Sequence, residues 1–281
     1  MKERPPATDP LPRPVIDTHC HLDVVDRHLG DSLDPDEALD LARAAGISRV
    51  VQVGCDVASS TWAADFAEGR SDVVAAVALH PNDAPRIAAR EGRTGLEAAY
   101  DAIAALAERP SVRAIGETGL DYYRTRDEAD HLVQHDSFRR HIDMAKRLGK
   151  TLVIHDRDAH DDILRILEEE GAPPRVVFHC FSGDAAMARF CADRGWLCSF
   201  AGVVTYKNAE DLREALRVLP REAFLVETDA PYLTPVPHRG AVNASYLIPL
   251  TVRTMAEVRG EPLEQVCDDL WANSQRAFGP L

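Results

Sequence analysis

The chain has 281 residues, of which 45% are apolar, and a formal net charge of −14. This composition excludes collagen-like, disordered and disulfide-scaffold classes, and the length fits one large α/β barrel as well as two small domains. Because an acidic protein repels polyanions at long range, stable coating of nucleic acid is not expected. Any contact with DNA or RNA should therefore be local, with metal ions providing positive charge.

The six cysteines are scattered and form no C-x-x-C pair. This usage indicates buried, reduced thiols and a cytoplasmic location. The first 13 residues are charged and rich in proline and lack the apolar segment of a signal peptide. We expect them to form a flexible leader, and we expect residues 14–281 to form a single domain. No apolar run reaches the roughly 18–20 residues of a membrane helix, so no membrane association is expected.

Short apolar runs alternate along the chain with longer helical segments. Since polarity does not alternate within the runs, they are typical of strands buried on both faces of a parallel sheet. The eight predicted strands cover residues 14–19, 48–54, 72–80, 112–117, 150–155, 175–179, 195–200 and 223–229. Predicted helices cover residues 34–45, 58–68, 95–109, 126–148, 159–170, 184–194 and 208–219, with two more near 244–259 and 262–278.

Eight strand–helix units predict a (β/α)8 TIM barrel with an extra C-terminal helix. Several predicted helices carry clear end signals. Asp34 and Pro35 fit the cap and first position of a helix, and Gly46 fits its end. A doubly wound open sheet is the alternative, but the glycine-rich phosphate loop that usually follows its first strand is absent.

Metal-binding and proton-carrying side chains follow six of the predicted strands. The carboxyl ends of barrel strands form the catalytic face. His19 and His21 are two positions apart on an extended strand, so both can point into the barrel mouth. The metal ligands that we expect are His19, His21, Glu117, His155, His179 and Asp229.

These six groups are more than one catalytic ion needs, since a catalytic metal keeps open positions. We therefore expect two divalent ions and a hydrolytic site, with Glu117, from the fourth strand, as the natural bridge between them. Mixed imidazole and carboxylate donors suit zinc, manganese, iron or nickel, whereas magnesium prefers oxygen ligands, so the sequence does not fix the metal, and Mg²⁺, Mn²⁺ and Zn²⁺ are the candidates. Asp17 is expected to orient a ligand histidine from behind.

Substrate contacts are less sharply specified than metal ligands. The candidates are His80, Asp121, Tyr122, Arg157 and Arg239. Arg157 and Arg239 could bind phosphate, although each also fits a surface ion pair or loop contact. His131 and His135 lie four positions apart on a predicted helix, but without the glutamate of a metalloprotease motif they do not indicate zinc.

Six segments in order carry a family resemblance. They are IDTHCHLD (16–23), LHPND (79–83), IGETGLDYYR (115–124), IHDRDA (154–159), FHCFSG (178–183) and ETDAPYLTPVPHRG (227–240). From about residue 15 to residue 278 the chain resembles the TatD family of metal-dependent deoxyribonucleases, in the amidohydrolase superfamily. The resemblance independently implies a (β/α)8 barrel.

The resemblance also implies individual roles. His19 and His21 match ligands of a first metal, and Asp229 matches a ligand that also serves as general base. Glu117 matches the shared carboxylate, and His155 and His179 match ligands of a second metal. Family members hydrolyse phosphodiester bonds, commonly trimming DNA from the 3′ end with magnesium or manganese.

The leading hypothesis is therefore a DNase that acts on DNA ends or short oligonucleotides. The alternative is a two-metal hydrolase of a small ester, lactone or phosphoester, although the predicted fourth strand offers Glu117 and no lysine for carboxylation. A non-enzymatic scaffold is disfavoured because all six ligand positions are intact. After Arg239 and Gly240 the family usually has Asn, an acidic residue and Pro, whereas this chain has AVNAS (241–245), which leaves the substrate preference open.

Overall fold

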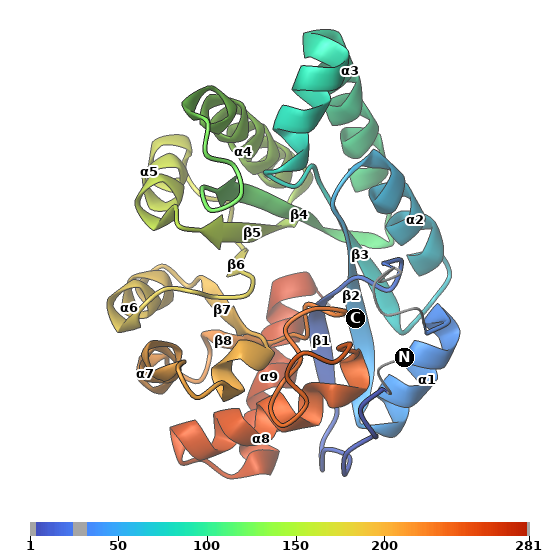
Figure 1. The fold of residues 1–281 in the computed structure, drawn as a ribbon, viewed down its shortest axis with the longest axis vertical. Coiled ribbons are helices and arrows are strands. Elements are labelled where there is room, and N and C mark those ends of the chain that lie inside the picture. Colours follow the sequence, from blue (N-terminus) through green and yellow to red (C-terminus); the bar gives the residue numbers. More distant parts are fainter. Residues whose placement is uncertain (1–3, 25–32, 280–281) are drawn as a thin grey trace. The chain divides into compact units, whose positions relative to one another are not determined.

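The computed structural model describes residues 4–24 and 33–279. Along these residues, eight parallel strands alternate with helices, and their order in the sheet is their order in the chain (Figure 1). This pattern confirms the predicted (β/α)8 TIM barrel and its C-terminal addition. The strands are β1 (Val15–Cys20), β2 (Ile47–Gly54), β3 (Val73–Val77), β4 (Val112–Asp121), β5 (Thr151–Arg157), β6 (Val176–Phe178), β7 (Leu197–Phe200) and β8 (Phe224–Val226).

The chain divides into two compact units. Unit 1 comprises residues 1–52, 71–73 and 183–281, and unit 2 comprises residues 53–70 and 74–182. The helices of unit 1 are α1 (Pro35–Ala44), α6 (Ala185–Asp193), α7 (Glu210–Val218), α8 (Ile248–Arg259) and α9 (Leu263–Phe278). Two 3₁₀ turns, η1 (Gly202–Thr205) and η2 (Ser245–Leu247), also belong to it. The helices of unit 2 are α2 (Val57–Ala67), α3 (Asp83–Ala107), α4 (Glu128–Leu148) and α5 (His160–Glu170).

Unit 1 is built around the junction of the first and last strands. β1 pairs in parallel with β2, β7 pairs with β8, and a further parallel bridge joins Cys20 to Ala230. Helices α8 and α9 pack on this sheet, and the Nδ2 of Asn273 on α9 donates to the backbone oxygen of Phe224 at 2.8 Å. The start of the chain and its last strand therefore present their carboxyl ends side by side.

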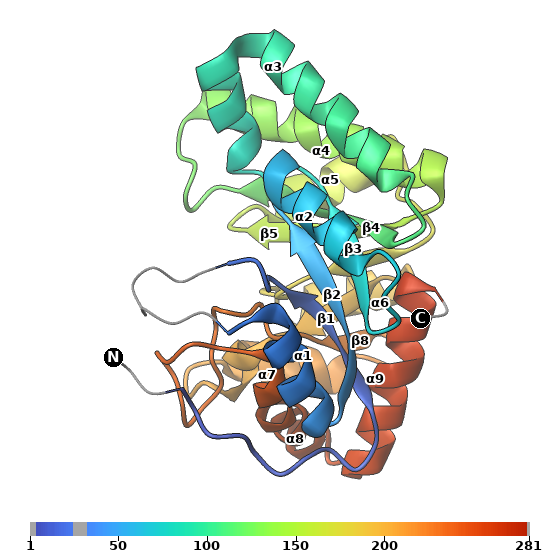
Figure 2. The ribbon, with the colours of Figure 1, turned by 90° about the vertical axis from the view of Figure 1, so that its right-hand side faces the viewer.

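Unit 2 contains β4 to β6 and residues 74–77 of β3, in consecutive parallel pairs. Helices α3 and α4 pack against each other and against β4 (Figure 2). The fully buried side chains of Ile115, Phe138, Ile142 and Leu152 form the core beneath them. Strands β4 and β5 extend four and two residues beyond the predicted strands, and end at Asp121 and Arg157.

The predicted start of the third helix at residue 95 is wrong. Helix α3 begins at Asp83, and Gly92 interrupts it with a φ of 68°. Pro85 lies in the first turn, where its missing N–H needs no partner within the helix, so it does not prevent helix formation. The other predicted helices agree with the observed ones within a few residues.

The segment expected to form a flexible leader contacts unit 1 at several points. Leu11 is buried and its backbone nitrogen donates to Ala45 O at 3.1 Å. The hydroxyl of Tyr246 donates to Pro5 O at 2.6 Å, and Arg253 donates to the backbone oxygen of Asp9 at 2.9 Å. The mobility of this segment stays a prediction, as does the single domain over residues 14–281.

Across residues 4–24 and 33–279, no helix has both the length and the apolar character needed to cross a membrane. The six cysteines are free thiols in the structure, four of them buried and two, Cys55 and Cys180, half-buried. His28 lies outside the described residues.

Candidate metal centre

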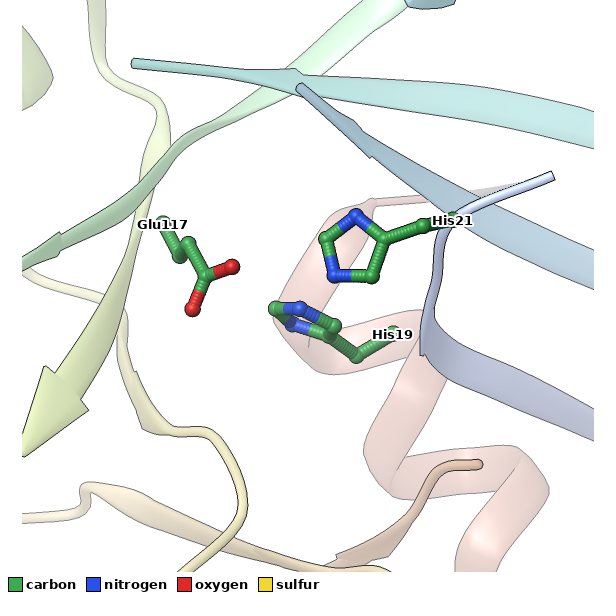
Figure 3. A group of neighbouring side chains, drawn as sticks. All are labelled: His19, His21 and Glu117. Carbon is green, nitrogen blue, oxygen red and sulfur yellow. The ribbon is translucent and has the colours of Figure 1, made fainter. Parts of the chain in front are cut away.

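The end of β1 places two imidazoles together in unit 1. His19 and His21 are both buried, and their ring centroids lie 5.1 Å apart with an edge-to-face arrangement (Figure 3). Their two-residue spacing turns both side chains to the same side of the extended chain, as predicted.

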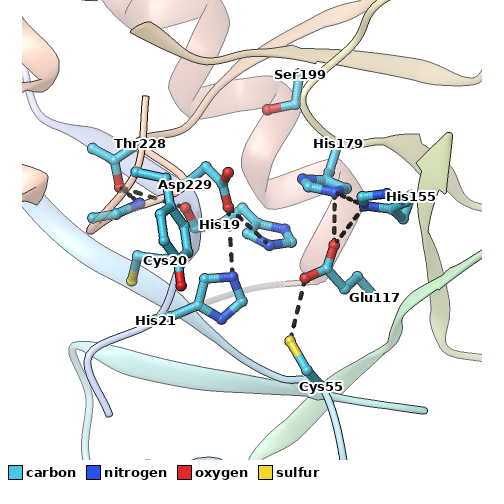
Figure 4. A network of polar contacts seen from close by, with 12 residues as sticks. His19, Cys20, His21, Cys55, Glu117, His155, His179, Ser199, Thr228 and Asp229 are labelled. Carbon is cyan, nitrogen blue, oxygen red and sulfur yellow. Dashed lines mark hydrogen bonds and ion pairs between the residues drawn. The ribbon is translucent and has the colours of Figure 1, made fainter. Parts of the chain in front are cut away.

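Asp229 completes this first cluster. Its Oδ1 lies 3.5 Å from Nε2 of His21 and 3.8 Å from Nε2 of His19 (Figure 4). The residue follows β8 and has a φ of 52°, a left-handed conformation that residues other than glycine adopt only at a cost in free energy. Its backbone nitrogen donates to His19 O at 2.9 Å, which secures this conformation and brings the carboxylate to the histidines.

A buried carboxylate supports the first cluster from behind. Asp17 accepts hydrogen bonds from the nitrogen and hydroxyl of Thr228 at 2.9 and 2.6 Å, and from the hydroxyl of Ser245 at 2.7 Å. Burial raises the pKa of Asp17 to about 6, against the effect of these hydrogen bonds. It also accepts from the backbone nitrogen of His19 at 3.3 Å. Asp17 therefore orients the chain that carries His19 through the backbone.

A second cluster lies in unit 2 around Glu117, near the end of β4. Its Oε2 lies 2.8 Å from Nε2 of His179 and 3.1 Å from Nδ1 of His155 (Figure 4). The same oxygen lies 3.9 Å from Nε2 of His80. One potential ligand atom from each of His80, Glu117 and His155 lies within 4.8 Å of the others. Strands β4, β5 and β6 and the turn after β3 thus converge on one carboxylate.

The pKa values in the second cluster shift in different directions: those of Glu117 and His80 are lowered, whereas hydrogen bonds with Asp121 and Glu117 raise that of His155 against the effect of burial. Burial by itself would raise the pKa of Glu117, but the imidazoles of His179 and His80 and the hydrogen bond with His155 hold it well below its usual value. Burial lowers the pKa of His80 to about 3, so this ring is neutral at pH 7. Metal ions bind ionised carboxylate and neutral imidazole, so the shifts of Glu117 and His80 favour the binding forms, and His155 would release any proton it carries when an ion binds. The residues of this cluster therefore fit a metal.

Two polar residues fix the orientation of His155. Asp121 is buried, and its Oδ2 lies 3.3 Å from Nε2 of His155 and accepts from Nδ2 of Asn82 at 2.8 Å. Burial would raise the pKa of Asp121, but the hydrogen bonds from His155, the backbone of Arg124 and Asn82 lower it overall. We expected Asp121 to contact substrate; in the structure its side chain is directed at His155, and a contact with substrate stays a prediction.

Two contacts of this cluster were missed by the sequence analysis. The thiol of Cys55, which follows β2, donates to Oε1 of Glu117 at 3.3 Å (Figure 4). Asn82 links Asp121 to the strand-end loop, and its Oδ1 accepts from the hydroxyl of Thr125 at 2.8 Å. The LHPND segment that contains Asn82 could have indicated a role, whereas Cys55 carries no signal in a single sequence.

The other residues expected to contact substrate all have contacts with side chains of the protein. His80 belongs to the second cluster, with its ring centroid 4.5 Å from that of His155. The hydroxyl of Tyr122 lies 2.6 Å from Nε2 of His135 and donates to the carboxylate of Asp162, so it is engaged within the protein. The guanidinium groups of Arg157 and Arg239 stack on aromatic rings, as cation–π contacts with Tyr123 at 4.0 Å and Tyr206 at 4.4 Å.

Imidazole and carboxylate groups gathered at the strand ends of a (β/α)8 fold are characteristic of metal-dependent hydrolases. Residues 16–279 match the family model described as TatD related DNase. The chain belongs to this family, and it is a metal-dependent hydrolase.

The similar proteins agree with this membership. The "Uncharacterized metal-dependent hydrolase TatD" of Mycobacterium tuberculosis is 44% identical over 94% of this chain and 98% of its own length. The "Uncharacterized metal-dependent hydrolase YcfH" of Escherichia coli K12 is 36% identical over 94% of this chain and 95% of its own length. The crystal structure of YjjV, a TatD homologue from Escherichia coli K12, has a TM-score of 0.81 and 26% identity, covering 94% of this chain and 97% of its own.

Proposed function

We propose that the protein is a deoxyribonuclease that hydrolyses phosphodiester bonds at the 3′ ends of DNA or short oligonucleotides. The observation that carries the proposal is the second cluster, in which the ionised carboxylate of Glu117 faces the imidazoles of His155 and His179. This donor set fits a divalent ion with positions left for substrate oxygens. The family description, TatD related DNase, supports DNA as the substrate class.

Two divalent ions, Mg²⁺, Mn²⁺ or Zn²⁺, are assigned to the two clusters. His19, His21 and Asp229 would hold one ion, and Glu117, His155 and His179 would hold the other. When bound, such ions lower the pKa of water and stabilise the leaving oxygen.

The protein's own groups have separate tasks in this proposal. Asp229 is the general base, because it is a carboxylate with a side chain that is 16% exposed, next to the two buried histidines. Asp17 and Asp121 hold the ligand residues in place through Thr228 and His155. Arg157, at the end of β5, provides positive charge for a substrate phosphate.

The net charge of −14 sets a limit on the substrate. A duplex contacted over many phosphates would be repelled, whereas a single-stranded end needs few contacts. The proposal therefore predicts weak binding of long duplex DNA and activity that falls as the salt concentration rises.

The test is hydrolysis of single-stranded oligonucleotides labelled at either end, by metal-stripped protein with and without Mg²⁺ or Mn²⁺. Metal-dependent release of mononucleotides from the 3′ end is expected, and it should be lost in Glu117→Gln and Asp229→Asn. Glu169→Gln is the matched control, because Glu169 is a half-exposed carboxylate on α5 that pairs with Arg139. Absence of cleavage with either metal would contradict the DNase proposal and favour hydrolysis of a small ester, lactone or phosphoester.

A further inference from the structure

Two adjacent tyrosines after β4 have opposite environments. The hydroxyl of Tyr122 is held between His135 on α4 and Asp162 on α5, and its ring stacks on His131 with the centroids 4.0 Å apart. The next residue, Tyr123, is 51% exposed. Tyr122 was one of the candidate substrate contacts, but Tyr123 is the one that presents an accessible aromatic ring.

The loop that carries Tyr123 is fixed from both sides. Asp121 accepts from the backbone nitrogen of Arg124 at 2.8 Å, and the hydroxyl of Thr125 donates to Asn82 at 2.8 Å. The backbone nitrogen of Tyr122 donates to Arg157 O at 3.0 Å. These hydrogen bonds hold the chain on both sides of Tyr123, so less backbone entropy is lost when a ligand stacks on the ring.

One side of the Tyr123 ring is already covered by a cation. The guanidinium carbon of Arg157 lies 4.0 Å from the ring centroid, within the range of a cation–π contact. Arg157 is two residues beyond His155 on β5, so the two side chains leave the strand on the same face, roughly 7 Å apart along it. The aromatic–arginine pair therefore lies next to the second cluster and within reach of a neighbouring nucleotide.

We propose that Tyr123 and Arg157 form a stacking platform for the nucleobase at the end of a single strand whose phosphate is bound at the second cluster. The free face of the Tyr123 ring receives the base, and Arg157 behind it provides positive charge for the phosphate backbone. Stacking on an aromatic ring does not depend on the identity of the base, so the platform recognises single-stranded nucleic acid without sequence preference. This inference deepens the proposed function and rests on it for the class of substrate.

Equilibrium binding to hydrolysis-resistant oligonucleotides tests the platform. Phosphorothioate strands of about five nucleotides are compared with strands that lack only the terminal base, at the 3′ or the 5′ end, by fluorescence anisotropy with the full chain and Mn²⁺. Removal of one terminal base should weaken binding to the unmodified protein about tenfold. In Tyr123→Ala the ratio of the affinity for complete strands to that for strands lacking the terminal base should fall toward one. Tyr123→Phe keeps the aromatic ring and should retain most of this preference. Leu132→Ala, an exposed apolar residue on α4, is the control that should leave the ratio unchanged.

Arg157→Gln gives an independent readout. The substitution should weaken the binding of complete strands and of strands lacking the terminal base to the same extent. It should also reduce the slope of log affinity against log salt concentration by about one. An unchanged discrimination in Tyr123→Ala, or no discrimination by the unmodified protein, would overturn the platform. Cleavage of ordinary oligonucleotides by the same preparation is scored separately. If the protein prefers strands with the terminal base but cleaves no DNA, the DNase proposal is refuted and the stacking platform stands. If it cleaves DNA but shows no preference for the terminal base, the stacking platform is refuted and the DNase proposal stands.

Discussion

The buried carboxylate of Asp17 on β1 accepts both the backbone N–H and the hydroxyl of Thr228, at 2.9 and 2.6 Å. Residues 211 positions apart in the chain are thereby joined directly behind His19 and Asp229. This link connects the first strand with the last at the point where the first cluster forms. It makes the stability of unit 1 and the geometry of that cluster depend on the same carboxylate.

Replacement of Asp17 by Ala should lower the free energy of unfolding by about 3 kcal/mol, because buried donors of Thr228 and Ser245 lose their acceptor. Urea unfolding of metal-free protein measures this. Asp193→Ala removes an exposed carboxylate at the end of α6 and should change stability by less than about 0.5 kcal/mol. Equal effects of the two substitutions would contradict the role of Asp17.

Gly119→Ala should disrupt the second cluster without touching a ligand. Gly119 has a φ of 139°, and a Cβ there would overlap the backbone oxygen of His155. We expect a loss of about 4 kcal/mol in stability and much weaker Mn²⁺ binding, measured by urea unfolding and calorimetry. Gly171→Ala is the control, because its φ of 71° is also positive but a Cβ meets nothing within 4 Å. It should cost about 1 kcal/mol and leave metal binding intact.

Glu117→Gln should weaken metal binding directly. The substitution keeps the size of the side chain but removes the negative charge that faces His155 and His179. Affinity for Mn²⁺, measured by isothermal titration calorimetry, should fall about 100-fold or more. Glu169→Gln, which changes a half-exposed carboxylate on α5 that pairs with Arg139, should bind Mn²⁺ like the unmodified protein. Undiminished affinity in Glu117→Gln would refute the assignment of this carboxylate.

Stability should fall in mild acid because of His141. This ring is buried in unit 2, accepts from the backbone nitrogen of Leu79 and contacts Ser137 O at 2.7 Å. Burial lowers its pKa from 6.5 to about 4. As the pH falls, His141 therefore takes up a proton in the unfolded chain before it does so in the folded protein. The stabilisation that comes from its neutral ring is present above pH 6.5 and is lost as the pH falls toward 4.

The contribution lost from His141 between pH 7 and pH 5 is about 2 kcal/mol. It is measured as the difference in urea-unfolding free energy between the two pH values, for the unmodified protein and for His141→Gln. The variant, without a titrating ring, should be less stable at pH 7 but should show a pH dependence smaller by that amount. An identical pH dependence in both proteins would show that His141 is not held neutral by the fold.

The strands and most helices could be predicted because local signals specify them. Asp34 accepts from the backbone nitrogens of Asp36 and Glu37, and Pro35 occupies the first turn of α1, as the sequence indicated. The helix at Asp83 was not predicted, because Pro85 and Gly92 are local breakers that the surrounding packing overrides. Propensity is a weak guide where tertiary contacts decide.

The residue types of both clusters were visible in the sequence, since His19, Glu117, His155 and Asp229 each follow a buried apolar run. Their partners were not. That Asp121 contacts His155, and that Cys55 approaches Glu117, depends on which strands are neighbours and in which register they pair.

The sequence by itself determined the order of strands and helices, the positions of the imidazoles and carboxylates at strand ends, and the family. Hydrophobic runs and capping residues act over a few positions, so they can be recognised without a structure. Only the tertiary structure decided that Tyr122 faces the protein and Tyr123 the solvent, and that Asp17 reaches Thr228. Those outcomes depend on the burial of one side chain against residues distant in the chain, and no local pattern encodes such contacts.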